Sequence, residues 1–360
     1  MAIPQEFFTK VKEALDSCHN PLIFFDDDPD GVCSFIQVYR HIGDGHGVVV
    51  KSMPIIDEKF LRKVEEYQPD KIIVLDVPKI SEEFARQAKR DIIWIDHHDG
   101  EVPKGLIKFS PRDYDNENLC TSGIVYKALR EHLWIGSVGA IADWTMPDFI
   151  EDFKIQYPKL LPARVHAPEK ALFKSRAGQL ARLISFMLKD STTEVMKSVR
   201  TLCRIEDPEE VLSQTSSQGK FLAKRADRMA SEYKHVLGTA KKARTRDEFL
   251  IFTYSDCNNS ITNDLANELA FLYPNKVIII GREKSGEVKM SIRGSRYHLP
   301  SLLEQALAGV NGYGGGHEHA CGSAVKKDDF PRFLEQFRDA VKRVKKERTA
   351  SKKESTTQGR

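Results

Sequence analysis

The sequence lacks paired cysteines and long apolar runs. No two of its six cysteines form a C-x-x-C pair, and all are widely spaced: Cys18, Cys33, Cys120, Cys203, Cys257 and Cys321. This spacing argues against a structural zinc site and against a disulfide framework. No apolar run approaches the ~20 residues that span a bilayer, and the first residues do not have the form of a signal peptide. We therefore expect a cytoplasmic protein that does not contact a membrane.

The overall composition is ordinary for a globular protein, with 41% hydrophobic and 30% charged residues. A length of 360 residues favours two domains, because single domains typically have ~100–200 residues. The net charge is only +3, but the C-terminal stretch from Lys342 to Arg360 is strongly basic. We expect its front part to continue a helix and residues 346–360 to form a disordered tail. Two roles stay open for this tail: contact with a polyanion, or simple solvation.

A short apolar run at residues 92–95 predicts a buried strand, and Asp96, His97 and His98 follow it directly. Carboxylates and imidazoles are common metal ligands. Taken alone, this segment is equally well explained as a strand that ends in polar turn residues. The case for a metal site depends on the recurrence of the pattern elsewhere.

The same pattern recurs three more times. A predicted strand at residues 21–25 runs into Asp26, Asp27, Asp28 and Asp30, and a predicted strand at residues 71–75 ends in Asp76. A segment rich in small residues, 135–142, ends in Asp143, which we place with the other strand ends. Aspartate favours turns, but carboxylates this close together repel one another unless cations hold them. Because ligands bind at the carboxyl ends of parallel strands, four acidic ends at one edge favour a metal centre.

The order of elements predicts an α/β fold in two domains. Predicted helices at 32–42, 60–67 and 82–89 separate strands at 21–25, 48–50, 71–75 and 92–95, which is typical of a parallel sheet with right-handed crossovers. We expect this N-terminal catalytic domain to occupy residues 1–150. A helical connector at 151–246 and a smaller C-terminal α/β domain at 247–345 would follow. The last connector helix is basic from Lys220 to Arg246, and both a solvated face and a wall that contacts nucleic-acid phosphates explain it.

The acidic motifs resemble those of a known family. In order and spacing across residues 20–145, they are similar to the four motifs of the DHH phosphoesterase superfamily: Asp26-x-Asp28-x-Asp30-Gly31, Asp76, Asp96-His97-His98 and Asp143. Many members carry a histidine four residues before the middle aspartate of the first motif, where this chain has Phe24. The placement of Asp26, two residues before Asp28, resembles the arrangement in RecJ-like members. Either Asp26 or water would therefore complete the metal coordination that the histidine provides in other members.

The resemblance implies a role for each residue of the centre. Asp28 and Asp30 would each hold one of two metal ions, Asp76 would bridge them, and His97 and Asp143 would complete the second site. His98 would contact the substrate phosphate or assist the leaving group. Asp96 would orient the histidines, with direct ligation as the alternative. Ligation rich in oxygen suits two Mn²⁺ ions, or Mg²⁺, better than zinc.

A second resemblance lies near the C-terminus. The Gly314-Gly315-Gly316-His317 turn, with Ser291-Ile292-Arg293 upstream, is similar to the DHH-associated substrate domain. Glycines permit unusual backbone conformations and let a phosphate approach bare N–H groups. The resemblance implies that these glycines, Arg293 and His317 bind the substrate, with Arg296 a weaker candidate.

Together these expectations describe a two-metal-dependent phosphodiesterase with its active site between the domains. The expected substrates are single-stranded RNA or DNA and short oligonucleotides, cleaved to mononucleotides from one end. One alternative is a small-molecule phosphatase or phosphodiesterase acting on adenosine bisphosphate, linear dinucleotides or polyphosphate. Another is a non-catalytic scaffold of a replication complex. A replication or repair complex is also a candidate partner for an active nuclease.

Overall fold

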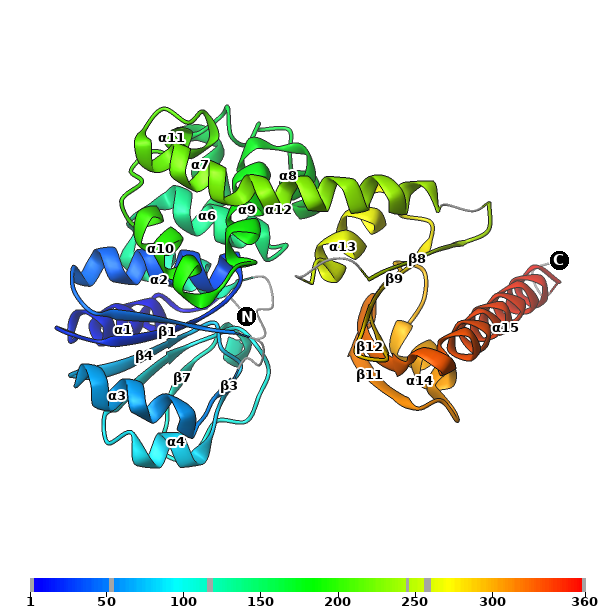
Figure 1. Ribbon diagram of the computed structural model, residues 1–360, viewed down its shortest axis with the longest axis horizontal. Coiled ribbons are helices and arrows are strands. Elements are labelled where there is room, and N and C mark those ends of the chain that lie inside the picture. Colours follow the sequence, from blue (N-terminus) through cyan, green and yellow to red (C-terminus); the bar gives the residue numbers. More distant parts are fainter. Residues whose placement is uncertain (1–2, 52–54, 115–118, 244–245, 256–259, 358–360) are drawn as a thin grey trace. The chain divides into compact units, whose positions relative to one another are not determined.

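The structure, a computed structural model, describes residues 3–51, 55–114, 119–243, 246–255 and 260–357, with side chains through residue 346. The chain divides into two compact units, Met1–Ala230 and Ser231–Arg360 (Figure 1). We describe each unit by itself. The described part of the chain contains no helix that is both long and apolar enough to cross a bilayer.

The first unit is built on a parallel five-stranded sheet in the order β2-β1-β4-β6-β7. Its strands are β1 (Leu22–Asp26), β2 (His46–Val50), β4 (Lys71–Leu75), β6 (Asp91–Ile95) and β7 (Lys108–Phe109). Two short strands, β3 (Ile55–Ile56) and β5 (Lys79–Ile80), pair separately in parallel. The predicted parallel sheet is therefore confirmed. The strands predicted from apolar runs are β1, β2, β4 and β6.

Helices cover both faces of this sheet and continue into a helical region (Figure 1). The helices of the catalytic part are α1 (Gln5–Asp16), α2 (Pro29–Ile42), α3 (Leu61–Tyr67), α4 (Glu82–Gln87), α5 (Thr121–Leu129) and α6 (Leu133–Ala142), with 3-10 turns η1 (Glu58–Phe60) and η2 (Pro111–Tyr114). The following helices are α7 (Ile150–Gln156), α8 (Pro168–Lys174), α9 (Arg176–Leu188), α10 (Thr192–Leu202), α11 (Glu209–Leu212) and α12 (Ser217–Lys242).

Alternate residues of β1 pack into two separate cores. Ile23 and Phe25 pack with buried residues of α1, α2 and α5. Phe24 packs in the other core, which includes Val64 of α3 and Phe84 of α4. Both faces of β1 are buried, which explains why its sequence is a continuous apolar run rather than an alternating one.

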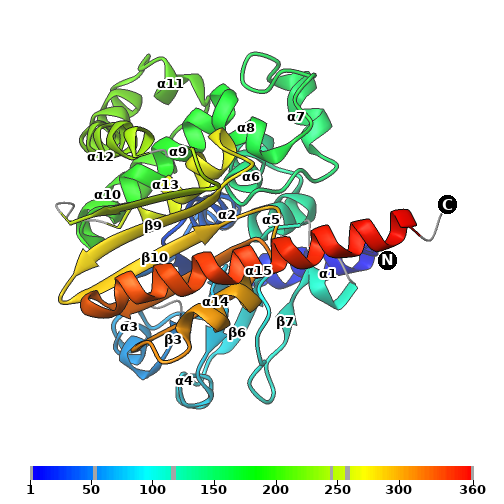
Figure 2. The ribbon, with the colours of Figure 1, turned by 90° about the vertical axis from the view of Figure 1, so that its right-hand side faces the viewer.

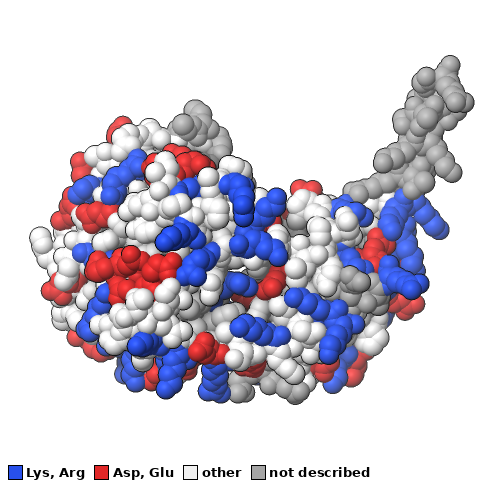
Figure 3. Space-filling view, turned by 90° about the horizontal axis from the view of Figure 1, so that it is seen from above, with Lys and Arg blue, Asp and Glu red and all other residues white. Residues whose placement is uncertain are grey.

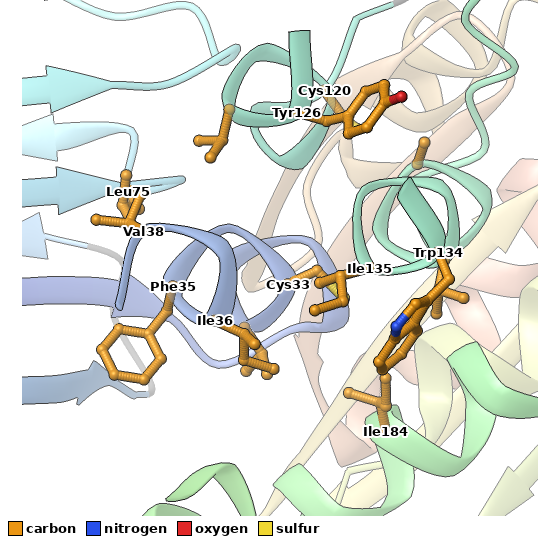
Figure 4. Packing of buried hydrophobic residues seen from close by; sticks show 14 of the residues in the cluster. Cys33, Phe35, Ile36, Val38, Leu75, Cys120, Tyr126, Trp134, Ile135 and Ile184 are labelled. Atoms are coloured by element: carbon orange, nitrogen blue, oxygen red, sulfur yellow. The ribbon is translucent and has the colours of Figure 1, made fainter. Parts of the chain in front are cut away.

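Helix α2 lies in the larger of these cores. Figure 4 shows the side chain of Cys33 on α2 beside that of Ile135 on α6, and the side chain of Trp134 on α6 beside that of Ile184 on α9; all four belong to one buried cluster. This packing fixes the position of α2. Its N-terminus carries the first acidic motif.

The segment that ends in Asp143 is helix α6 and not a further strand, so the prediction that every acidic residue follows a strand is wrong here. The small residues explain the difference. A Cβ atom added at Gly139 would lie 2.3 Å from Oγ of Ser122 on α5, and one added at Gly136 would lie 2.7 Å from Cβ of Tyr126. Glycine therefore allows α6 to pack closely against α5. Asp143 then caps the C-terminal end of a buried helix.

Within the predicted helical connector, residues 168–188 form two helices, α8 and α9. The break lies at Ser175, whose Oγ accepts a 3.0 Å hydrogen bond from the backbone N–H of Gly178 and so caps α9. A Cβ at Gly178 would lie 2.1 Å from the Leu172 carbonyl oxygen. The chain therefore turns sharply at this point.

The second unit contains a mixed five-stranded sheet in the order β11-β12-β10-β9-β8. β8 and β9 are parallel, and the other pairs are antiparallel. Its strands are β8 (Phe249–Tyr254), β9 (Val277–Lys284), β10 (Glu287–Arg293), β11 (Gly312–His317) and β12 (Ala320–Lys326), and its helices are α13 (Thr262–Leu272), α14 (Leu299–Leu307), η3 (Lys327–Asp329) and α15 (Phe330–Thr357). α14 and α15 share one core with this sheet (Figure 2), and α13 packs on β9 and β10. This is the smaller α/β domain that the sequence predicts.

Two local predictions in this unit are wrong. The glycine-rich segment at residues 314–317 is the edge strand β11 and not a turn. Its glycines let it lie close to β12, since a Cβ at Gly314 would lie 2.8 Å from the Gly322 carbonyl oxygen. The tail predicted to be disordered from residue 346 is helical through Thr357.

The cysteines in the described part of the chain are free thiols: Cys18, Cys33, Cys120, Cys203 and Cys321. The sixth, Cys257, lies outside the described residues.

Candidate metal centre

The first acidic motif occupies the turn from β1 into α2. Asp28 is the N-cap of α2, and its Oδ1 accepts a 2.9 Å hydrogen bond from the backbone N–H of Gly31. Asp30 follows in the first helical turn and is buried. A Cβ at Gly31 would lie 2.7 Å from the Asp26 carbonyl oxygen. Glycine thus permits a turn tight enough to bring the carboxylates of Asp26, Asp28 and Asp30 to one end of the sheet.

Asp76 follows β4 in a left-handed backbone conformation, with φ of 60°. Its backbone N–H donates a 3.0 Å hydrogen bond to the Ile95 carbonyl oxygen, and its side chain is 1% exposed. This conformation costs an aspartate of order 1–3 kcal/mol and is typical of functional sites. The conformation places the carboxylate beside the first motif.

The predicted ligands meet in three groups of potential metal-binding atoms. Within each group the atoms lie within 4.8 Å of one another: Asp26, Asp28 and Asp76; Asp30, His97 and Asp143; Asp76, His97 and His98. Asp76 and His97 each belong to two groups. Oδ1 of Asp76 lies 3.4 Å from Nε2 of His97, and Oδ2 of Asp143 lies 3.8 Å from Nδ1 of His97. The assignment of individual ligands stays a prediction, but the geometry brings all six predicted residues together.

The electrostatics of this cluster favour a bound cation. Burial, together with the charges of Asp30 and Asp28, raises the pKa values of Asp76 and Asp143 well above the ordinary value of an aspartate. Burial and the charges of Asp28 and Asp27 raise the pKa of Asp26 to about 8. The carboxylates therefore repel one another, and a divalent ion would relieve this repulsion. Oxygen atoms and one or two imidazoles form a suitable donor set for such an ion.

The N-terminus of α5 holds two of the carboxylates. The backbone N–H groups of Thr121 and Ser122 donate to the two oxygens of Asp30, at 2.9 and 3.0 Å, and the Ser122 hydroxyl also donates to Asp30. The Thr121 hydroxyl donates to Oδ1 of Asp76 at 2.9 Å. Sequence reasoning missed both residues. The available signal was the pair of small hydroxyl residues that opens a helix directly after Cys120.

Among the described residues, Asp96 is not a member of any of the three groups of potential metal ligands. It is fully buried, and its Oδ1 lies 2.7 Å from Nδ1 of His98. Nζ of Lys108 lies 2.6 Å from its other oxygen. Burial would raise the pKa of Asp96, but its hydrogen bond with His98 and the charges of His98 and Lys108 outweigh burial and lower it. Burial would likewise lower the pKa of His98, and Asp96 reverses this effect and raises it. Sequence reasoning missed Lys108.

The predicted substrate residues lie in the second unit. Arg293 on β10 and His317 on β11 are both in register with Ala320 of β12, so they lie in one row across the sheet. The Arg293 guanidinium donates a 2.7 Å hydrogen bond to Oδ1 of Asn267 and also bonds to the side chain of Asn263. His317 is exposed, as are the three glycines before it. Arg296 is exposed and bonds to the side chain of Asn275.

The predicted basic helix is α12. Its exposed cations are Lys220, Lys224, Arg228, Lys234, Lys241 and Lys242. Arg225 instead pairs with Asp190 and Glu194, each at 2.9 Å, and Arg244 lies outside the described residues. The face in Figure 3 carries both Lys or Arg and Asp or Glu side chains. Both interpretations of this helix, solvation and nucleic-acid contact, therefore stay open.

Comparison with known families agrees with the motifs. Residues 20–145 match the DHH family, N-terminal domain, and residues 247–343 match the DHHA1 domain. The chain carries a DHH domain and a DHHA1 domain. The DHH domain contains every residue of the metal cluster, and the DHHA1 domain contains Arg293 and the glycine strand.

Solved structures with the same fold include three of RecJ. One is RecJ from Thermus thermophilus in complex with Mn²⁺, with a TM-score of 0.66, 16% identity, and coverage of 94% of this chain and 54% of that chain. The same RecJ has also been solved with Mg²⁺. The third is exonuclease RecJ bound to manganese, with a TM-score of 0.61, 13% identity, and coverage of 95% of this chain and 96% of that chain.

A fourth similar structure is the pGpG-specific phosphodiesterase PggH from Vibrio cholerae, with a TM-score of 0.50, 12% identity, and coverage of 89% of this chain and 99% of that chain. This chain spans about half the length of the Thermus RecJ. No curated protein sequence matches it. At these identities the likeness establishes a shared DHH phosphoesterase fold.

Proposed function

We propose that the protein is a divalent-metal-dependent phosphodiesterase that hydrolyses short or single-stranded oligonucleotides and releases mononucleotides from one end. The observation that carries this proposal is the overlap of three potential ligand groups at the DHH motifs. The similar fold of RecJ and of PggH supports phosphodiester chemistry.

Each residue of the cluster has a proposed role. Asp28 and Asp30 would hold one ion each. Asp76 would lie between the two sites, because its carboxylate groups with Asp26 and Asp28, and its Oδ1 lies 3.4 Å from Nε2 of His97, which groups with Asp30. His97 and Asp143 complete the site of Asp30. Asp26 joins the site of Asp28, which favours Asp26 over water at that position. Mn²⁺ is the proposed ion, with Mg²⁺ as the alternative.

When two such ions are bound, they lower the pKa of a coordinated water and stabilise the charge on the phosphoryl oxygens. The side chains of the protein bind and orient the substrate. His98 uses Nδ1 for its contact with Asp96, so its Nε2 is the atom that meets the phosphate or the leaving oxygen. The backbone of residues 314–316, with Arg293 and His317, binds the phosphate or base of the nucleotide.

A small-molecule phosphodiesterase is the second candidate, and the similarity to the pGpG-specific enzyme favours it. One experiment separates the two. Labelled oligonucleotides from two to about twenty residues are incubated with the protein in Mn²⁺ or Mg²⁺, and the products are resolved by length. The proposal predicts stepwise release of mononucleotides from substrates of all lengths. Cleavage of dinucleotides alone would favour the second candidate, and no cleavage of any substrate would favour a non-catalytic scaffold.

A further inference from the structure

Lys108, at the start of β7, is a buried lysine beside the metal cluster. Its side chain is 5% exposed, and β7 pairs with β6 so that Lys108 is in register with Trp94. Nζ lies 2.6 Å from Oδ2 of Asp96, donates a 2.6 Å hydrogen bond to the His98 carbonyl oxygen, and lies 4.7 Å from the centre of the Trp94 ring. The ammonium group is therefore enclosed by a carboxylate, a carbonyl oxygen and an aromatic ring.

These contacts hold the DHH motif at two points. Lys108 binds one oxygen of Asp96, and the other oxygen binds Nδ1 of His98 at 2.7 Å. The second contact, to the His98 carbonyl oxygen, holds the backbone of the same histidine. The side chain of His98 is still 42% exposed, so the restrained ring is accessible from solvent.

We propose that Lys108 is a positioning residue that acts through His98. By fixing both the Asp96 carboxylate and the His98 backbone, it directs Nε2 of the ring toward the substrate. This inference rests on the proposed phosphodiesterase function for its kinetic consequence. The geometric part, restraint of the His98 ring by Lys108, is independent of that function.

Lys127 provides a matched comparison. Its Nζ also lies over an aromatic ring, 5.1 Å from the centre of Phe8, and 2.9 Å from a carboxylate oxygen of Asp148. Asp148, however, is 73% exposed and bonds to none of the cluster residues that we name. A lysine that only stabilises the fold would behave like Lys127.

The test is a double-mutant cycle on the Mn²⁺-loaded protein. Lys108→Met, Lys108→Arg, Lys127→Met, His98→Ala and the double variant Lys108→Met/His98→Ala are compared with the wild type. kcat and KM are measured on an RNA dinucleotide and on bis-p-nitrophenyl phosphate, whose leaving group needs little assistance. Mn²⁺ affinity is measured by calorimetry.

Lys108→Met should lower kcat on the dinucleotide by ~10–100-fold, a part of the ~10²–10⁴-fold that general acid–base assistance contributes, with KM and Mn²⁺ affinity within about threefold of wild type. The loss should be much smaller on bis-p-nitrophenyl phosphate and absent in the His98→Ala background, since residues that act as one unit are not additive. Lys108→Arg should restore part of the rate, and Lys127→Met should behave as wild type. An additive loss in the double variant, or a parallel loss of Mn²⁺ affinity, would overturn the proposal.

A second readout does not depend on hydrolysis. In the metal-free protein, the proton between Nδ1 of His98 and Asp96 should give a downfield NMR signal that disappears in His98→Ala. Lys108→Met should shift or broaden this signal, and Lys127→Met should leave it unchanged. An unchanged signal in a folded Lys108→Met variant would contradict the positioning role, whereas inactivity of the wild type on both esters would instead contradict the proposed function.

Discussion

The hydroxyl of Thr121 donates a 2.9 Å hydrogen bond to Oδ1 of Asp76, and both side chains are buried. This contact joins the N-terminus of α5 to the end of β4. Oδ1 of Asp76 also lies 3.4 Å from Nε2 of His97. Thr121 therefore fixes the carboxylate that two of the potential ligand groups share.

Replacement of Thr121 by valine should weaken Mn²⁺ binding by about tenfold, because loss of a partner that orients a ligand typically costs 10–100-fold in metal affinity. Thr121→Ser keeps the hydroxyl and should stay within about twofold of wild type. Isothermal titration calorimetry measures both variants. Equal affinity in the valine variant and the wild type would exclude Thr121 from the metal centre.

The stability of the metal-free protein should fall as the pH rises from 5 to 8. Burial and neighbouring charges raise the pKa of Asp26 to about 8 and that of Asp76 well above its ordinary value, whereas unfolded aspartates ionise near pH ~4. Between the pKa values of the unfolded and the folded state, the unfolded chain binds fewer protons than the folded chain. A rise in pH therefore lowers the free energy of unfolding.

Thermal unfolding in EDTA and in MnCl₂ measures this effect. Because Mn²⁺ binds the ionised carboxylates, the rise in Tm that it produces should be larger at pH 8 than at pH 5. A Tm in EDTA that rises between pH 5 and pH 8 would contradict the assignment of a repulsive carboxylate cluster.

His317→Ala should chiefly weaken binding of nucleotide substrates. A hydrogen bond to a charged group is worth about 1.5–3 kcal/mol, so KM for a dinucleotide should rise by about tenfold or more. Hydrolysis of bis-p-nitrophenyl phosphate, which lacks a nucleoside, should change less. The control is His319→Ala, since His319 is exposed and lies only two residues further along the chain. An equal loss on both substrates would place His317 in the chemical step.

The basic C-terminal segment should affect long substrates only. Truncation after Lys346 keeps the described side-chain contacts of α15, including the ion pair of Lys345 with Glu248 at 2.8 Å and the packing of Val344 on the core. If the removed cations contact phosphates, affinity for a 20-mer single strand should fall, and its salt dependence should lessen by ~0.7 log units per lost contact. Dinucleotide turnover should not change. Fluorescence anisotropy at several salt concentrations decides between contact with nucleic acid and a solvated tail.

The sequence predicts the parallel sheet well because its strands are continuous apolar runs that end in chemically distinctive residues. The run at residues 92–95 shows both features, since its strand is buried and Asp96 follows at the edge. The metal cluster could be predicted for the same reason. All of its members except Asp143 follow strands whose carboxyl ends share one edge.

The parts that could not be predicted depend on contacts between distant segments. Residues 135–142 resemble a strand in apolar content, but they form a helix whose Gly139 packs closely on Ser122 of α5. Lys108 looks like an ordinary surface lysine in the sequence. The burial of its side chain depends on the pairing of β7 with β6. Strand β7 is too short for this pairing to be recognised in the sequence.

The most direct test of the account is Mn²⁺-dependent hydrolysis of a labelled RNA dinucleotide by the wild type and by Asp76→Ala. After removal of bound metal, the wild type should be inactive, and added Mn²⁺ should restore cleavage. Asp76→Ala should abolish the restored cleavage, because it removes the carboxylate shared by two ligand groups. Activity within tenfold of wild type in an Asp76→Ala protein that still binds Mn²⁺ would contradict the two-metal centre.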